Sequence, residues 1–158
     1  MKKLNRKGFT LVELLAVIII LAIVVGISIP AITNIINDSK NNALGVAVDA
    51  AEKYLSDQYS YMQLSAENVQ ADFSAWISST SSSDGVYTDT LTSEGDKALI
   101  EAMGFNSEDV TQVTIKVYQA GGACVIVDSV PNTSQYYSTE YWTASGSADG
   151  TKNESKGC

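Results

Sequence analysis

The chain has 158 residues with 10 Lys and Arg against 18 Asp and Glu, a formal net charge of −8, and no histidine. This length suits one domain, or a small domain with an appendage. Such an acidic chain is a poor match for a protein that binds nucleic-acid phosphates, so no nucleic-acid partner is expected. Without histidine the commonest general base and metal ligand is missing, which argues against most hydrolase and zinc chemistry.

Positive charge is concentrated at the N-terminus. Four of the ten basic residues lie in the first seven positions, where there is no acid: Lys2, Lys3, Arg6 and Lys7. A chain without residues 1–8 would keep six lysines and all 18 acids, for a net charge of −12.

An apolar run follows the basic segment. From Leu14 to Asn37 there are 24 residues without a charge. As a helix at about 1.5 Å per residue they would extend roughly 36 Å, enough to cross a bilayer core of about 30 Å. The basic flank predicts that the N-terminus is cytoplasmic and the rest lies outside.

Two ordinary explanations of this run are a secretory signal peptide and a plain signal anchor. A signal peptide has a shorter apolar core that ends at a small-residue cleavage site. Residues 26–28, Gly-Ile-Ser, could serve as that site, but the sequence continues apolar through residues 29–31. A signal anchor fits the length. Neither explains Glu13, because an acid inside a membrane helix is costly and indicates a function.

The heptapeptide Lys-Gly-Phe-Thr-Leu-Val-Glu at residues 7–13 accounts for that acid. Here the sequence resembles the type IV prepilin signature, a short basic leader and a glycine before Phe-Thr-Leu-x-Glu at the head of a long apolar helix. Pro30 stands where type IV pilins commonly carry a helix-kinking proline. The resemblance is close over residues 1 to about 60 and covers only the architecture beyond them.

The resemblance implies a processing pathway and a set of partners. A membrane-embedded aspartyl prepilin peptidase would cut between Gly8 and Phe9 on the cytoplasmic side and N-methylate Phe9. Residues 1–8 would then be the leader peptide, whose short length is similar to the type IVa class. The partners implied are other pilin subunits in a homopolymeric filament, the pilus assembly platform with its ATPase machinery, the membrane before assembly, and host or abiotic surfaces. The divergent head and its Asn, Ser and Asp bias favour a Gram-positive source.

Glu13 is predicted to set the register of assembly. Cleavage would leave an amine on Phe9 that is mostly protonated at neutral pH. We expect Glu13 to pair with the Phe9 ammonium of a neighbouring subunit. Either charge left unpaired in a dry core would cost about 3–5 kcal/mol.

Gly26 and Pro30 are predicted to weaken the helix. Proline lacks an amide hydrogen and clashes with the carbonyl four residues earlier, which is that of Gly26. The resemblance suggests that this segment loses helical order in the assembled filament, whereas in a lone anchor the same pair would only be a kink.

Beyond the assembly segment, residues 9–30, the sequence predicts the amphipathic half of the same helix over residues 31–60. One face is apolar at a spacing of three to four residues: Ile32, Ile36, Ala43, Ala47, Ala50 or Ala51, and Tyr54. The other face is polar: Asn37, Asp38, Asn41, Asn42, Asp49, Glu52, Lys53 and Asp57. A helix from Phe9 to about Ser60 would be roughly 78 Å long, too long for a compact domain of this size.

Residues 61–111 are expected to connect the helix to a sheet. Residues 67–78 place Val69, Phe73, Trp76 and Ile77 at helical spacing, which predicts a short packed helix. Residues 78–94 indicate a polar surface loop with one extended piece around Val86. Ser93 could cap a further short helix that continues through Met103 and ends at Gly104.

Residues 112–144 are expected to form the sheet. Strict alternation over residues 113–118, a Gly121-Gly122 turn and residues 123–127 predict a hairpin. Residues 136–143 suggest a third strand. The expected fold is therefore α+β, a type IV pilin fold whose long helix packs on a three- or four-stranded antiparallel sheet. Residues 145–158 form a polar, weakly structured tail.

The two cysteines are Cys124, in a predicted strand, and Cys158. In an exported protein a disulfide between them is plausible, and it resembles the C-terminal disulfide region of many pilins. A bridge to a polar tail departs from that pattern, and the alternative is a buried Cys124 with a free Cys158. No residue pattern predicts a catalytic site, metal site or cofactor, so the protein is expected not to be an enzyme.

These features predict a structural pilin of an extracellular filament with roles in adhesion, surface motility or biofilm formation. The expected location is a single-pass cytoplasmic-membrane precursor that becomes part of a pilus on the cell surface. A pseudopilin of a type II secretion or DNA-uptake machine shares the same biogenesis and remains an alternative. A membrane-tethered binding domain that never polymerises is the third, although a tether needs neither Glu13 nor the Gly8–Phe9 junction.

Overall fold

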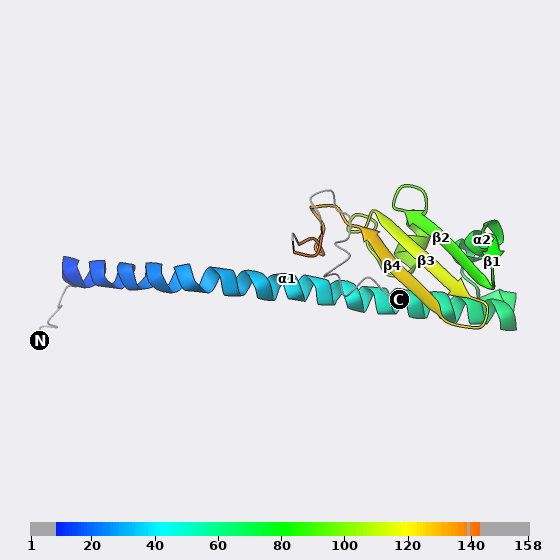
Figure 1. Cartoon of the computed structure of the whole chain (residues 1–158), viewed down its shortest axis with the longest axis horizontal. Coiled ribbons are helices and arrows are strands. Elements are labelled where there is room, and N and C mark those ends of the chain that lie inside the picture. Colours follow the sequence, from blue (N-terminus) through cyan, green and yellow to red (C-terminus); the bar gives the residue numbers. More distant parts are fainter. Residues whose placement is uncertain (1–8, 139, 143–158) are drawn as a thin grey trace, which may run out of the picture. The chain divides into compact units, whose positions relative to one another are not determined.

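A computed structural model of the chain describes residues 9–138 and 140–142. The chain divides into two compact units, residues 1–36 and residues 37–158. One helix, α1 (Leu11–Leu64), supplies nearly all of the described part of the first unit and the first element of the second (Figure 1). The helix therefore extends a few residues past the end predicted near Ser60.

In the first unit no large apolar side chain of α1 is buried. Every large apolar side chain from Phe9 to Ile36 is at least 47 % exposed, the lowest value being that of Val17. This segment makes α1 the one helix in the described part of the chain that is long and apolar enough to cross a membrane. Length and composition alone support that statement, and they agree with the predicted span.

The second unit combines the rest of α1 with short helices and a sheet. The further helical elements are η1 (Ala66–Asn68), α2 (Ala71–Ser79) and α3 (Lys97–Ala102). The strands are β1 (Ser82–Ser83), β2 (Val86–Thr92), β3 (Gln112–Tyr118) and β4 (Ala123–Ser129). They form one antiparallel sheet in the order β1-β2-β3-β4, so each strand pairs with its neighbour in sequence. The α+β, type IV pilin-like fold is thus confirmed.

Two tight turns close the hairpins of this sheet. Asp84 and Gly85 join β1 to β2 with positive φ angles of 52° and 77°, as a two-residue type I′ turn requires. Gly121 and Gly122 join β3 to β4 with φ angles of 104° and 90°. The β3–β4 hairpin was predicted from its alternation and its glycine pair, and it is confirmed.

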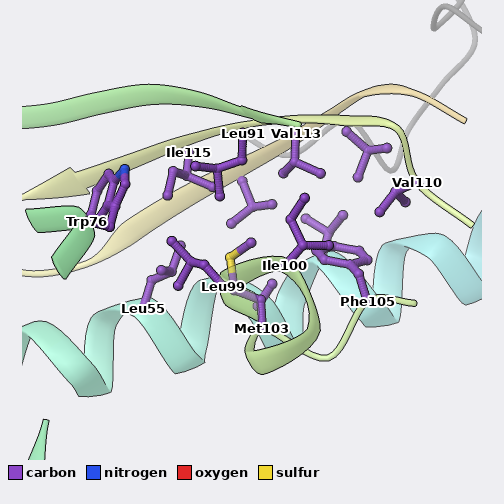
Figure 2. Packing of buried hydrophobic residues seen from close by; sticks show 14 of the residues in the cluster. Leu55, Trp76, Leu91, Leu99, Ile100, Met103, Phe105, Val110, Val113 and Ile115 are labelled. Atoms are coloured by element: carbon purple, nitrogen blue, oxygen red, sulfur yellow. The ribbon is translucent and has the colours of Figure 1, made fainter. Parts of the chain in front are cut away.

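The core lies between the inner face of the sheet and the helices. Figure 2 shows Leu55 of α1, Leu99 and Ile100 of α3, and side chains of β2 and β3 meeting in one cluster. A hydrogen bond from the Val125 amide to Glu52 Oε1 (3.1 Å) also links β4 to α1. Across this core, alternate residues of the strands face α1 and are fully buried: Leu91, Val113, Ile115, Val117, Val125 and Val127.

The predicted apolar face of α1 was correct in part: Ala51 is buried, and Ala47 and Tyr54 pack against the core, but the largest buried side chains were not in the predicted set. The buried residues are Leu44, Val48, Ala51 and Leu55, at intervals of three to four residues, while Ala43 is exposed. Asn41, assigned to the polar face, is buried. The larger Leu and Val side chains bury more apolar surface than the alanines, and this difference decides which face meets the sheet. Ile32 and Ile36, also assigned to that face, are exposed residues of the first unit.

Two assignments to strand and loop were also wrong. Residues 86–92, predicted as loop with a short extended piece, form β2, which pairs with β3 along all seven of its residues. Residues 136–143 were predicted as a strand, but over 136–138 and 140–142 the chain forms turns and irregular structure, with a single isolated β-bridge at Trp142. Amides of Tyr137 and Trp142 there donate to the carbonyls of Ser134 (3.1 Å) and Ser138 (2.9 Å).

The short helices agree with the sequence except at their beginnings. The predicted helix 67–78 is split into η1 and α2, and Phe73, Trp76 and Ile77 are buried as expected. Helix α3 starts after Asp96, so Ser93 is not its cap. Gly104 does end α3, with φ of 96°. The Gly104 and Phe105 amides donate to Glu101 and Ile100 carbonyls (3.0 and 3.2 Å), which is a Schellman motif.

Candidate processing and assembly segment

Helix α1 begins with a capping box formed by Thr10 and Glu13. The Thr10 amide and hydroxyl both donate to Glu13 Oε2, at 2.9 and 2.8 Å. In return the Glu13 amide donates to Thr10 Oγ1 at 3.3 Å. The reciprocal pair satisfies backbone donors at the start of the helix that have no partner within the helix. Sequence reasoning missed this role of Thr10, although Thr-x-x-Glu is the pattern that predicts it.

The capping box fixes where the helical hydrogen bonds begin. The Leu14 amide donates to the Thr10 carbonyl at 3.2 Å, the first bond of the i to i−4 series. Phe9 precedes that series and its side chain is 85 % exposed. Gly8, the other residue of the predicted cleavage site, lies outside the described residues. The predicted pairing of Glu13 with a neighbouring subunit is a contact between chains, and it stays a prediction.

Gly26 and Pro30 both lie inside α1, which continues through them. Two hydroxyls beside Pro30 bond back to the helix, Ser28 Oγ to the Val24 carbonyl (2.7 Å) and Thr33 Oγ1 to the Ile29 carbonyl (3.0 Å). Such bonds satisfy the hydroxyls in an apolar medium and often accompany bends. The predicted loss of helical order belongs to the assembled filament and stays a prediction.

In the second unit, a segment near the C-terminal end of the described chain is tied to α1. We call residues 131–138 and 140–142 the strap. Lys40 Nζ donates to the Tyr137 carbonyl at 2.9 Å, and the Tyr141 hydroxyl donates to Asp38 Oδ1 at 2.6 Å. At its other end, the Gln135 amide and side chain donate to Asp109, at 3.1 and 2.7 Å. The strap was not predicted, because these partners are far apart in sequence.

Cys124 lies on β4, is 1 % exposed and is disulfide-bonded. Cys158, the other cysteine of the chain, lies outside the described residues. The pairing of the two therefore stays a prediction.

A surface cavity of about 410 Å³ opens among α2, β2 and α3. Three carboxylates line it, those of Asp72, Asp89 and Asp96, and Trp76 Nε1 donates to Asp89 Oδ2 at 3.0 Å. Asp96 Oδ2 accepts the Thr92 amide at 3.0 Å. Asp89 and Asp96 therefore already accept hydrogen bonds from other residues of the chain. Over the described residues, no group of three or more His, Cys, Asp or Glu side chains is placed to hold a metal ion.

Comparison with known proteins identifies the N-terminal segment. Residues 3–29 match the family model of the prokaryotic N-terminal methylation motif. Neither a curated protein nor a solved structure matches the chain. The motif is of a structural, pilin type, and in general it implies assembly with other pilins and processing by a prepilin peptidase. The apolar helix and the motif together fit a membrane-anchored precursor. Residues 3–29 thus carry the class III signal of type IV pilins, at the head of a chain with an α+β, type IV pilin-like fold.

Proposed function

We propose that this protein is the structural subunit of an extracellular type IV pilus. It would be inserted in the membrane as a precursor, cut between Gly8 and Phe9, N-methylated on Phe9 and polymerised through α1. The filament would act in adhesion, surface motility and biofilm formation. The observation that carries the proposal is the methylation motif at the head of a helix whose large apolar side chains are all exposed over residues 9–36.

The physical argument concerns what covers that apolar surface. Contiguous exposed apolar surface of this extent is unstable in water and marks a membrane or protein contact. A bilayer covers it in the precursor, and the same segments of other subunits cover it in a filament. A helix apolar on all sides suits both environments, whereas a helix with one apolar stripe would expose its polar face to lipid in the precursor.

Glu13 gives the proposal its specificity. It is the one acid among residues 1–36, and the next is Asp38. A carboxylate brought into a dry bundle of helices needs a positive partner, and the ammonium on a processed Phe9 is the charge that cleavage creates. Requiring this pair selects one axial offset between subunits, because either charge alone would be buried without a partner.

The proposal is tested by the mature N-terminus and by the variants Glu13→Ala and Glu13→Gln. Mass spectrometry of sheared surface filaments should find N-methyl-Phe9 as the first residue. Both variants should insert in the membrane but yield filaments reduced at least about tenfold, as expected for loss of a buried charge pair. Glu94→Ala, at an exposed acid of the second unit, is the matched control and should leave filaments unchanged. An intact Met1 on the surface protein, or normal filaments from Glu13→Ala, would contradict the proposal.

A further inference from the structure

We propose that Thr10 and Glu13 are positioning residues for processing. Their capping box makes α1 begin at Leu11 rather than earlier, so that the Gly8–Phe9 bond is not taken into the helix and can be reached by the peptidase. This inference rests on the proposed cleavage at that bond. It assigns the capping box a task before assembly, distinct from the charge pairing of Glu13 in the filament.

The argument starts from the carbonyl groups. In an α-helix the carbonyl of the N-cap residue accepts the first helical hydrogen bond, from the amide four residues later. Here that acceptor is the Thr10 carbonyl, bonded to the Leu14 amide at 3.2 Å. The carbonyl of the Gly8–Phe9 bond precedes this acceptor by two residues. In a helix that begins at Leu11, the i to i−4 hydrogen bonds therefore do not involve the carbonyl that the peptidase must reach.

The sequence offers an earlier start if the capping box is lost. Glycine is about as good an N-cap as threonine, whereas valine is a poor one. With Gly8 as the N-cap, the helix would begin at Phe9. The Gly8 carbonyl would then accept the Val12 amide and become the first acceptor of the helical series. Upstream growth would thus occupy the carbonyl of the bond to be cut.

That occupation matters because of what hydrolysis requires. Water adds to the Gly8 carbonyl carbon and the bond to the Phe9 nitrogen breaks, which gives a Gly8 carboxylate and a Phe9 ammonium. The oxygen of that carbonyl gains negative charge in the transition state and needs donors from the enzyme. A carbonyl already bonded within a helix, with side chains on every side, has first to be freed. Only the fraction of precursor with a free bond is competent for binding.

The experiment follows cleavage of the full-length precursor by prepilin peptidase in detergent micelles. Thr10→Val removes the hydroxyl but keeps the β-branched shape, whereas Thr10→Ser and Thr10→Asn keep a capping side chain. We expect KM for Thr10→Val to rise roughly fivefold with kcat unchanged, since loss of a cap lowers the competent fraction by about that factor. Thr10→Ser and Thr10→Asn should be cut like the wild type. Carbon-13 chemical shifts of Phe9 should become helical in Thr10→Val alone.

The Glu13 variants separate this inference from the proposed function. Glutamine can complete a capping box but carries no charge. Glu13→Gln should therefore be cut at the wild-type rate yet show the reduced filament yield given above, while Glu13→Ala should be slowed in cleavage as well. Wild-type KM for Thr10→Val, or equal slowing of Thr10→Ser and Thr10→Val, would overturn the inference and leave the proposed function standing. Absence of cleavage at Gly8–Phe9 in the wild type would instead contradict the proposed function.

Discussion

Tyr54 shows at the level of one residue that the core does not satisfy every polar atom. Its hydroxyl oxygen is buried and has no hydrogen-bond partner among the described residues. Burial raises the pKa of this tyrosine, and the Asp72 carboxylate raises it further by repelling the phenolate. A buried hydroxyl without a partner costs free energy, while its ring still contributes apolar packing against the core.

Replacing Tyr54 by Phe is therefore expected to stabilise the fold. The free energy of unfolding, measured by urea titration of the full chain in detergent micelles, should rise by about 1 kcal/mol at neutral pH. Tyr61→Phe, at an exposed tyrosine, should change it little. A loss of about 1 kcal/mol in Tyr54→Phe would show that the hydroxyl makes a favourable contact.

The same variant should alter the response to alkali. Above about pH 10 the tyrosines of the unfolded chain lose their protons, whereas Tyr54 in the folded chain keeps its proton to a higher pH. The unfolded state then binds fewer protons, so the free energy of unfolding falls as the pH rises further. Phenylalanine releases no proton, so the fall should be shallower in Tyr54→Phe. Tyr136, whose pKa burial also raises, keeps part of the slope in both proteins.

Among the elements, the strap and the start of α1 in the second unit depend on each other. The strap has no regular hydrogen-bonded strand, and its described contacts with α1 include the bonds of Lys40 and Tyr141 to Tyr137 and Asp38. Residues of the strap still contribute to the core, with Trp142 buried and Tyr137 packed against it. We therefore expect the strap to open before the sheet does.

The double variant Lys40→Met, Tyr141→Phe tests this coupling. Both changes keep most of the apolar part of each side chain and remove one hydrogen bond, so together they should lower the free energy of strap opening by about 2–3 kcal/mol. Native-state hydrogen exchange should show faster exchange over residues 37–41 and in the strap, with no change in β2, β3 and β4. Lys53→Met is the control, because within the part of the chain that the structure describes Lys53 makes only an exposed i,i+4 pair with Asp57. Equal acceleration in the sheet would contradict a separate opening of the strap.

Elements determined by interactions between residues close in sequence could be predicted, whereas elements determined by distant residues could not. Local chemistry decides the β3–β4 hairpin and the end of α3, and both were predicted. Strand β2 was missed because its polar residues suggest a loop, although Asp84-Gly85 before it is a hairpin signal. Its assignment depends on pairing with β3, whose paired residues lie 20 to 32 positions later. The strap was mispredicted as a strand because its aromatic residues favour strands, while its actual partners lie on α1.

The candidate site divides in the same way. Phe9 and Glu13 could be named from a contiguous motif, and Pro30 from its place in the apolar run, and neither needs knowledge of the fold. The capping role of Thr10 is equally local and could have been predicted from the spacing of Thr10 and Glu13. The predicted pairing of Glu13 with Phe9 of another subunit stays a prediction, because its partner atoms belong to a different chain.

For the molecule as a whole, the average apolar content and the net charge each combine two segments with different surfaces. The apolar share of 45 % is ordinary for a globular protein. It combines residues 9–36, whose large apolar side chains are all exposed, with a second unit that buries most of its large apolar side chains in one core. The net charge of −8 likewise combines a basic segment, residues 1–8, with a remainder of −12. Such a charge favours solubility of the second unit and repulsion between exposed surfaces.

A disulfide between Cys124 and Cys158 would close a loop of about 35 residues from β4 to the last residue of the sequence. Because Cys124 is already buried, the cross-link would raise the free energy of unfolding mainly by restricting the unfolded chain. That effect is worth about 3–4 kcal/mol. Cys158→Ser should lower the free energy of unfolding by about that amount, and dithiothreitol should lower the wild type equally but leave the variant unchanged. Cys124→Ser should cost more, since it also places a hydroxyl in a buried position. Two free thiols in the denatured, non-reduced chain, or a dimer held by disulfides, would contradict this pairing.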